Sequence, residues 1–306
     1  MKLLITGALQ YAEKYIDKIK NLGYEIVFMQ NETDDLPCLP EDVEAVICNG
    51  LFLHHAIEDF TNLTYIQLTS VGFDRVPMEY VKEHNIEIHN ARGVYSIPMA
   101  ELAISGVLQL YKKSDFFALN KSKHEWIKNR ELLELNNKNV AIIGCGSVGT
   151  ECAKRFKAFC TNVISVDIVK PKSEFYDVFY SIDNIKDALL DSDIVVLTLP
   201  LTENTKYLFD KAMLKKMKKG SVLVNIARGA IVDESALIEV LDDEILSGAV
   251  LDVFESEPLE SNNRLWDMKN VVVTPHNSFV GENNSERLIE VIINNLIATL
   301  NEKKVK

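Results

Sequence analysis

The segment VAIIGCGSVG, Val140–Gly149, predicts the fold of the second half of the chain. An apolar run leads into Gly144, Gly146 and Gly149, which have the G-x-G-x-x-G spacing. The first glycine permits a tight turn, the second lets the backbone approach a pyrophosphate, and the third lets a helix pack closely on its strand. Glycines also occur in ordinary loops, but glycines at this spacing between an apolar strand and a helix predict a dinucleotide-binding turn.

Ser147 and Val148 begin the expected helix, whose free N–H groups favour an anion. Asp167 follows the last of these glycines by eighteen residues, at the end of the next apolar run. A carboxylate at this position would accept hydrogen bonds from the ribose hydroxyls of adenosine and repel a 2′-phosphate, so we expect NAD rather than NADP. Lys170 and Lys172 follow closely, and we interpret them as part of a solvated loop.

Short apolar runs separated by helical stretches extend this pattern along the chain. Two of them, IVVLTL and SVLVNI, are apolar continuously, as is typical of parallel strands covered on both faces. Helices are expected at Glu151–Phe159 and at Glu234–Leu241, the latter with Asp233 as its N-cap. The alternation predicts the α/β fold class, with two doubly wound parallel-sheet domains, a Rossmann cofactor domain and a flavodoxin-like substrate domain, and a cleft between them. The expected strands are Lys2–Thr6, Glu25–Met29, Ala45–Cys48, Thr64–Leu68, Glu87–Asn90, Val140–Ile143, Val163–Asp167, Ile194–Leu199, Ser221–Ile226, Ala249–Phe254 and Val271–Thr274.

The bulk composition is that of a soluble protein with two domains. The chain has 306 residues, 47% of them hydrophobic, whereas single cores usually stop growing at ~250–300 residues. A net charge of −12 argues against a nucleic-acid partner, which would need clustered Lys and Arg. There is no long apolar run and no signal-type N-terminus, so we expect no membrane partner and a cytoplasmic protein. Five cysteines without C-x-x-C spacing indicate reduced thiols, and no metal site is expected.

Three later motifs supply a cation, a carboxylate and an imidazole. Arg228 lies in NIARGAIVD, Glu257 in LDVFESEP and His276 in TPHNS. Taken alone, the arginine would suit a structural ion pair and the histidine a structural role. Arg228 follows a buried strand, however, at the edge where α/β sheets bind ligands, and its planar fork can hold a carboxylate and a carbonyl. His276 can exchange a proton near neutral pH, and Glu257 would hydrogen-bond its far nitrogen, fix the tautomer and favour the protonated form.

Together these motifs resemble those of the D-isomer-specific 2-hydroxyacid dehydrogenases. The resemblance extends from about Val71 to Trp266 and His276, and it is weaker over the N-terminal segment. It implies an NAD-dependent oxidoreductase that moves a hydride between the nicotinamide and a small 2-oxo or D-2-hydroxy acid. It also implies that Arg228, Glu257 and His276 are the catalytic residues, with Arg228 binding the substrate carboxylate and carbonyl.

The same resemblance implies a domain boundary at Pro98, where a long apolar helix begins. Residues 98–279 would form the NAD-binding domain. Residues 1–97 and 280–306 would form the substrate-binding domain, with Ser285–Leu300 as a helix packed on it. Because relatives dimerise through the helix that corresponds to the Pro98 helix, we expect a homodimer.

Further cofactor contacts are implied by the resemblance. Asp252 resembles the residue that contacts the nicotinamide carboxamide, although alone it would be interpreted as a helix cap or a surface acid. Cys160 stands where the family usually ends a helix with glycine, and a left-handed backbone there would cost a cysteine on the order of 1 kcal/mol. The implied cofactor-binding residues are Gly144, Gly146, Ser147, Val148, Gly149, Asp167, Leu199, Pro200, Thr205, Ile226, Ala227, Arg228, Asp252 and His276.

The implied substrate site draws on both domains. The backbone N–H groups of Val71 and Gly72, in TSVGFDRVP, would bind the substrate carboxylate, and Gly72 would need room or a positive φ. The implied substrate-binding residues are Val71, Gly72, Tyr95, Arg228 and His276. The sequence leaves open whether His54, His55, Arg92 or Phe279 line the pocket.

Two alternatives share the same motifs. Family members that act on 3-phosphoglycerate usually carry arginines in the loop that is here Cys48–Leu51, and they often have a further C-terminal domain. This loop has no arginine and the chain ends about thirty residues after His276, so a small unphosphorylated acid is favoured over 3-phosphoglycerate or another sugar acid. An NAD-sensing, corepressor-like binding protein is the alternative of another class. No basic face or interaction tail in the sequence supports it. The sequence does not name the acid or the physiological direction.

Overall fold

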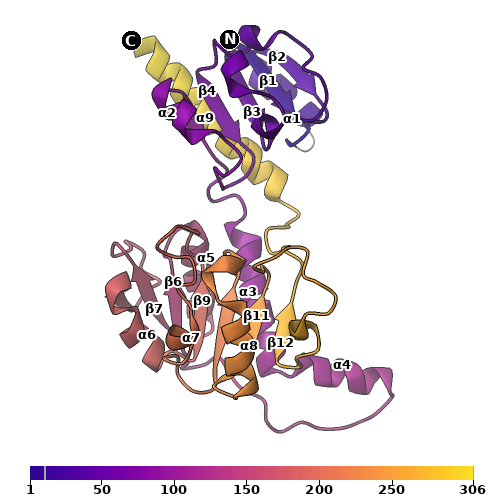
Figure 1. Cartoon of the computed structure of the whole chain (residues 1–306), viewed down its shortest axis with the longest axis vertical. Helices are drawn as coiled ribbons and strands as arrows, with labels where there is room; N and C mark the ends of the chain where they lie inside the picture. Colours follow the sequence, from indigo (N-terminus) through magenta and orange to yellow (C-terminus); the bar gives the residue numbers. More distant parts are fainter. Residues whose placement is uncertain (10–11, 306) are drawn as a thin grey trace. The chain divides into compact units, whose positions relative to one another are not determined.

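The computed structural model describes residues 1–9 and 12–305, and the chain divides into two compact units (Figure 1). Unit 1 comprises Met1–Tyr95 and Gly281–Lys306, and unit 2 comprises Ser96–Val280. The helix that opens unit 2 begins at Ser96 and carries Pro98 in its first turn, where no backbone donor is needed. Residues 10, 11 and 306, which belong to the expected substrate-binding domain, lie outside the described part of the chain.

Unit 1 is built on a parallel sheet of five strands in the order β2-β1-β3-β4-β5. This is the doubly wound order in which the first strand lies between the second and the third. Leu288, Ile292 and Leu296 of the C-terminal helix pack on one face of the sheet. Val81 and two 3-10 turns cover the other face. The elements are β1 (Lys2–Thr6), α1 (Ala12–Lys20), β2 (Glu25–Met29), β3 (Ala45–Cys48), β4 (Tyr65–Leu68), α2 (Met78–Glu83), β5 (Glu87–His89) and α9 (Asn284–Val305), with 3-10 turns η1 (Pro40–Asp42), η2 (Leu51–Leu53) and η3 (Ile57–Asp59).

Unit 2 is built on a parallel sheet of seven strands in the order β12-β11-β10-β9-β6-β7-β8. The strand order reverses at β6, which lies between β7 and β9, and ligands bind at such switch points in open α/β sheets. The strands are β6 (Asn139–Ile143), β7 (Asn162–Asp167), β8 (Val178–Ser181), β9 (Ile194–Leu197), β10 (Ser221–Asn225), β11 (Leu246–Leu251) and β12 (Val271–Val273). The helices are α3 (Ser96–Tyr111), α4 (Ser114–Ser122), α5 (Ser147–Ala158), α6 (Ile185–Asp191), α7 (Lys211–Leu214) and α8 (Glu234–Asp242), with 3-10 turns η4 (Ile182–Asn184), η5 (Gly229–Ile231) and η6 (Arg264–Trp266).

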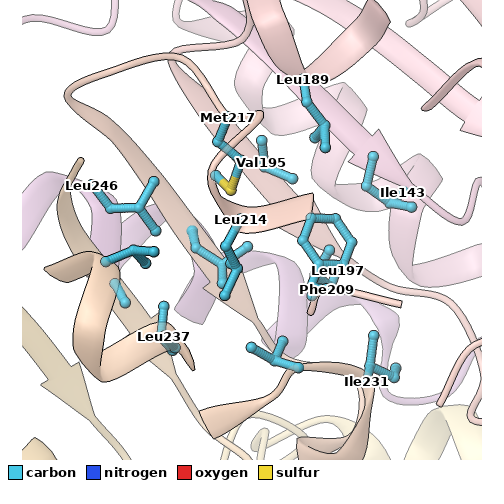
Figure 2. Packing of buried hydrophobic residues seen from close by; sticks show 14 of the residues in the cluster. Ile143, Leu189, Val195, Leu197, Phe209, Leu214, Met217, Ile231, Leu237 and Leu246 are labelled. Carbon is cyan, nitrogen blue, oxygen red and sulfur yellow. The ribbon is translucent and has the colours of Figure 1, made fainter. Parts of the chain in front are cut away.

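The core of unit 2 explains why its strands are apolar along their whole length. Val140 and Ile142 of β6 pack on the side of α3 and α5, whereas Ala141 and Ile143 pack on the side of α6, α7 and α8. Figure 2 shows part of the cluster on the side of α6, α7 and α8, which includes Ile143, Val195 and Phe209. Both faces of each central strand are therefore covered, as the continuous apolar runs predict.

Most of the expected strands are found within one or two residues of their expected bounds, and two strands differ by more. The edge strand β8 was not among the strands expected from the sequence. It has four residues, VFYS, which are exposed or half-buried at the edge of the sheet. Strand β11 was expected at Ala249–Phe254 but runs from Leu246 to Leu251. A register shift against β10 accommodates its early start, and the strand ends where Asp252 turns its carboxylate onto a neighbouring loop. Among the helices that the structure describes, none combines the length and apolar character needed to cross a membrane.

Candidate active site and cofactor site

The glycine turn between β6 and α5 has the geometry of a pyrophosphate cradle. Gly144 has a φ of 93°, and a Cβ atom placed on it would lie 2.7 Å from the backbone of Leu199. A Cβ on Gly149 would lie 2.2 Å from the carbonyl oxygen of Gly144, so only glycine lets the helix start this close to the strand. Gly146 faces open space, since nothing lies within 4 Å of such an atom. The turn therefore leaves room for phosphate oxygens at the N-terminus of a twelve-residue helix whose first residues are Ser147 and Val148.

Asp167 lies at the carboxyl end of β7, beside this turn. Its Oδ2 accepts a hydrogen bond from the Cys145 N–H at 2.6 Å, and its Oδ1 accepts from the Ile168 N–H at 2.7 Å. A carboxylate has about four lone-pair sites, so two remain for ribose hydroxyls. Burial raises the pKa of the Cys145 thiol to about 11, so the thiol stays protonated beside Asp167 at neutral pH. Lys170 and Lys172 are exposed, as expected of a solvated loop.

The other expected cofactor residues are held by short-range contacts. The Thr205 hydroxyl donates to the Pro200 carbonyl at 2.7 Å and accepts from the Thr202 N–H at 2.7 Å, which closes the loop after Leu199. Ile226 and Ala227 are buried at the end of β10, so they can offer a ligand little more than backbone. Cys160 has a left-handed backbone, with a φ of 59°.

The backbone around Arg228 is fixed on both sides. The Asn225 side chain accepts from the Ala227 N–H at 3.1 Å and donates to the Arg228 carbonyl at 3.0 Å. A Cβ on Gly229 would lie 1.9 Å from the Phe254 carbonyl carbon, so only glycine lets this turn pack against the loop after β11. The Arg228 side chain is exposed and donates to the Ala227 carbonyl at 2.7 Å. Its other donors remain available to a carboxylate or a carbonyl.

Glu257 and His276 form a hydrogen-bonded pair in the same region. Oε1 of Glu257 accepts from the Phe254 N–H at 3.0 Å, and its Oε2 lies 2.7 Å from Nδ1 of His276. Because a carboxylate only accepts, Nδ1 carries a proton, and Nε2 is left to exchange a proton with a ligand. The contacts through Gly229 and Phe254 link the Arg228 turn to this pair. The structure thus brings together the three residues that the sequence singled out.

The loop that carries His276 is anchored by Asp252. This carboxylate is 0% exposed and accepts from the Thr274 hydroxyl at 2.6 Å, the Asn277 N–H at 2.8 Å and the Ser278 N–H at 2.9 Å. Its backbone carbonyl accepts from the His276 N–H at 2.8 Å, and His276 itself has a left-handed φ of 49°. The interpretation of Asp252 as a helix cap or surface acid is wrong. It fixes a strained loop, a role that no local pattern signals.

The expected carboxylate-binding loop lies in unit 1, after β4. Val71 is exposed, and its carbonyl accepts from the Asn90 side chain at 2.7 Å. Gly72 does not have a positive φ. A Cβ at this position would lie 2.3 Å from Oδ1 of Asp74, so a larger residue would require the Asp74 side chain to move. The Tyr95 hydroxyl donates to the Thr69 carbonyl at 2.5 Å, so Tyr95 supports this loop. These residues belong to unit 1, whereas Arg228 and His276 belong to unit 2.

The competing histidines have ordinary surroundings. His54 is exposed, and His55 is half-buried with its Nε2 3.0 Å from the backbone carbonyl oxygen of Glu32. Phe279 packs its ring edge-to-face against the His276 imidazole, with 6.1 Å between the centroids. Among the residues whose side chains the structure describes, no three of His, Cys, Asp or Glu are grouped as a metal would require.

Comparison with known proteins supports a common origin for these features. A family model described as D-isomer specific 2-hydroxyacid dehydrogenase, NAD binding domain, matches residues 104–278. The chain is 34% identical to the glyoxylate reductase of Thermofilum pendens over 253 residues, which cover 78% of this chain and 72% of that one. It is 32% identical to the hydroxypyruvate reductase of Thermotoga maritima over 264 residues, which cover 82% and 83%.

Solved structures give the same result over nearly the whole chain. A crystal structure of a protein from Thermus thermophilus has a TM-score of 0.78 and 30% identity, and the alignment covers 99% of this chain and 97% of that one. An NAD-complexed D-isomer specific 2-hydroxyacid dehydrogenase from Lactobacillus delbrueckii ssp. bulgaricus has a TM-score of 0.81 and 25% identity, with coverage of 99% and 98%.

Proposed function

Since this chain belongs to the D-isomer-specific 2-hydroxyacid dehydrogenase family and carries its NAD-binding domain, we propose that it interconverts a small 2-oxo acid and the D-2-hydroxy acid. The observation that carries the proposal is the Glu257–His276 pair, 2.7 Å apart, linked through Gly229 and Phe254 to the Arg228 turn. An acid–base group and a cation that binds carboxylates are what reduction of a 2-oxo acid requires.

The roles of the residues follow from their chemistry. The Arg228 guanidinium binds the substrate carboxylate and carbonyl oxygen, which polarises the carbonyl. Nε2 of His276 donates the proton that the carbonyl oxygen needs as it becomes a hydroxyl. Glu257 accepts a hydrogen bond from Nδ1. This bond orients the imidazole ring and stabilises the imidazolium until the proton on Nε2 is transferred. The N–H groups of Val71 and Gly72 bind the substrate carboxylate.

The cofactor roles are also proposals. Bound NADH would supply the hydride. The Gly144–Gly149 turn binds its pyrophosphate, Asp167 accepts from the adenosine ribose, and the Leu199–Thr205 loop covers the adenosine. Ile226, Ala227 and Asp252 lie at the ends of β10 and β11, and we keep them as candidate neighbours of the nicotinamide.

A substrate panel tests this function directly. NADH oxidation is followed spectrophotometrically with glyoxylate, hydroxypyruvate, pyruvate and phosphorylated hydroxypyruvate, with Glu58→Ala as a surface control. We expect turnover with at least one unphosphorylated acid and D-configured product. No turnover across the panel, together with tight NADH binding, would instead support the corepressor-like binding protein. Preference for the phosphorylated acid would support the sugar-acid alternative.

We also propose that the chain forms a homodimer through the region of α3. Trp126, in the segment after α4, is 95% exposed, and Leu119 and Ile127 are 52% and 51% exposed. Such clustered exposed apolar side chains are typical of an interface. Light scattering after size exclusion should give the mass of two chains. Trp126→Lys should shift the mass towards one chain, and Trp266→Lys, a change at another exposed tryptophan, should not. A cytoplasmic location stays a prediction that cell fractionation can test.

A further inference from the structure

The carboxyl edge of the sheet in unit 1 holds a carboxylate in a nest of three donors. Oε1 of Glu32 accepts from the Thr6 hydroxyl and the Asn49 N–H, both at 2.7 Å. Its Oε2 accepts from the Gly50 N–H at 2.7 Å. Thr6 ends β1, Asn49 and Gly50 follow β3, and Glu32 lies three residues beyond the end of β2. One side chain therefore collects the free donors of two neighbouring strand ends.

The surroundings of Glu32 keep it in this position. The His55 ring nitrogen Nε2 lies 3.0 Å from the Glu32 backbone carbonyl oxygen, so the main chain is held as well as the side chain. Gly50 is buried, and a Cβ placed on it would lie 3.4 Å from Oε2 of Glu32 and 3.9 Å from Cδ of Arg75. Arg75 belongs to the loop that carries Val71, so the Glu32 carboxylate reaches the neighbourhood of that loop.

The register of the sheet sets these two loops side by side. Strands β3 and β4 are parallel neighbours, with Cys48 opposite Leu68, and the Thr69 N–H donates to the Cys48 carbonyl at 2.9 Å. The chain after β3 therefore continues as Asn49-Gly50 beside the chain after β4, which continues to Val71. Ligands of α/β sheets bind at this carboxyl edge. A substituent of an acid held at Val71, as the proposed function has it, would extend along this edge towards the Asn49–Gly50 turn in unit 1.

Three donors that bind the two oxygens of one carboxylate form an anion-binding site, which is called the anion receptor below. Bonds from hydroxyl and backbone N–H groups to a charged oxygen are among the stronger hydrogen bonds in proteins, and they would serve a phosphate as well as a carboxylate. In this chain the receptor is filled by the protein's own Glu32. A second anionic group on a ligand would meet an anion-binding site that Glu32 already occupies and a like charge, which costs about tenfold or more in affinity.

We infer that Glu32 is a specificity-determining residue that fills an anion receptor at the edge of unit 1 and thereby rejects acids with a second anionic group. Phosphorylated 2-oxo acids are the main class excluded. The inference rests on the proposed function for its kinetic meaning, but the receptor itself can be tested without turnover. Removal of the carboxylate exposes the donors of Thr6, Asn49 and Gly50, with the Arg75 cation close by.

The kinetic experiment compares Glu32→Ala and Glu32→Gln with Glu58→Ala, which removes the same charge from an exposed position in unit 1. The readout is the ratio of kcat/KM for phosphorylated hydroxypyruvate to that for hydroxypyruvate. We expect the ratio to rise about tenfold or more in Glu32→Ala. Glu32→Gln should give a smaller rise because the amide still fills the space, and Glu58→Ala should leave the ratio unchanged. A ratio within about twofold of wild type in both folded Glu32 variants overturns the inference. If Glu32→Ala does not fold, Glu32→Gln decides.

The binding experiment uses inorganic phosphate and needs no substrate. Thermal unfolding is measured with sodium phosphate against sodium chloride at equal ionic strength. A ligand of the folded state raises Tm by mass action, and phosphate can also bind the glycine turn of unit 2 in every variant. Glu32→Ala should therefore show a saturable rise that exceeds the rise in wild type and in Glu58→Ala, and this excess is the phosphate effect that tests the inference. If wild type reduces neither acid, the proposed function fails, and the phosphate titration alone decides the inference about Glu32. Absence of the phosphate effect in that case overturns it.

Discussion

The carboxyl edges of the two sheets both carry a carboxylate that binds the loop after another strand of the same sheet. In unit 1, Glu32 accepts from the N–H groups of Asn49 and Gly50, which follow β3. In unit 2, Asp252 accepts from the N–H groups of Asn277 and Ser278, which follow β12. Each carboxylate also accepts from a threonine hydroxyl. A carboxylate with bound N–H and hydroxyl groups therefore holds a loop at each sheet edge. The two edges differ in the groups that they expose to a ligand.

The difference lies in the side chains that these loops leave exposed. The edge of unit 2 presents the Arg228 guanidinium and the His276 imidazole, one a cation and the other a proton carrier. The edge of unit 1 presents the backbone at Val71 and Gly72, with Glu32 sequestered by three donors. We interpret unit 2 as the source of the reaction chemistry and unit 1 as the source of recognition. Substitutions at the two edges should then alter different kinetic parameters.

The largest expected effect comes from His276→Ala in unit 2. Turnover should fall by ~10²–10⁴, because general acid–base catalysis contributes about this much, while NADH affinity stays nearly unchanged. Steady-state kinetics and an NADH fluorescence titration measure the two quantities. His84→Ala, at an exposed histidine of unit 1, serves as the control. Near-normal turnover in His276→Ala would show that His276 is not the acid–base group. The proposed contrast, with reaction chemistry in unit 2 and recognition in unit 1, would then be wrong.

Arg228→Lys should have the next largest effect. Lysine keeps the charge but loses the planar fork, so kcat/KM should fall about 10- to 100-fold, the range expected for lost hydrogen bonds to a charged group. Both KM and kcat should change, and the unfolding midpoint should not. Arg264→Lys is the matched control, because Arg264 pairs with Asp242 on the surface at 2.9 Å. Unchanged kinetics in Arg228→Lys would mean that Arg228 serves only as a surface residue.

Local sequence signals predicted the parts of the molecule that depend on local chemistry. The glycine turn is one example, since Gly144 and Gly149 are required by approaches of 2.7 Å and 2.2 Å to nearby backbone. The helix after Asp233 is another, because the Asp233 side chain accepts from the Ala236 N–H as an N-cap does. Continuous apolar runs located the central strands, whose faces are both covered.

The contacts that the sequence did not reveal are long-range. Asp252 meets its partners 22 to 26 residues further along the chain, and Glu32 meets Asn49 and Gly50 across 17 and 18 residues. No spacing rule connects such pairs, because the intervening elements set their distance. The edge strand β8 was missed for a different reason. It has only four residues and lies at the edge of the sheet, where its side chains are exposed or half-buried, so its sequence lacks the longer apolar pattern of the central strands.

Cofactor choice gives a smaller and more specific effect in unit 2. Asp167→Ser should lower kcat/KM with NADH about tenfold by removing ribose hydrogen bonds and should change that with NADPH less. The Cys145 N–H also loses its 2.6 Å acceptor, so part of the loss reflects a looser glycine turn. Kinetics with both cofactors in wild type, Asp167→Ser and the surface control Asp191→Ser separate these outcomes. Equal use of NADH and NADPH by wild type would show that Asp167 does not bind the ribose.

The smallest expected effect tests whether Asp252 anchors the His276 loop. Thr274→Val removes only the hydroxyl that donates to Asp252 at 2.6 Å and leaves the Asn277 and Ser278 N–H bonds in place. We expect kcat to fall about three- to tenfold, with NADH affinity unchanged, since a charge-assisted hydrogen bond holds the loop. Amide exchange at Asn277 and Ser278 should become faster in the ligand-free protein, a change that a role confined to the nicotinamide would not produce. Thr64→Val, at a threonine in unit 1, is the control. If amide exchange at Asn277 and Ser278 stays at the wild-type rate, Asp252 does not hold the His276 loop in place. Its similarity to Glu32 would then be one of hydrogen-bond geometry without a shared role.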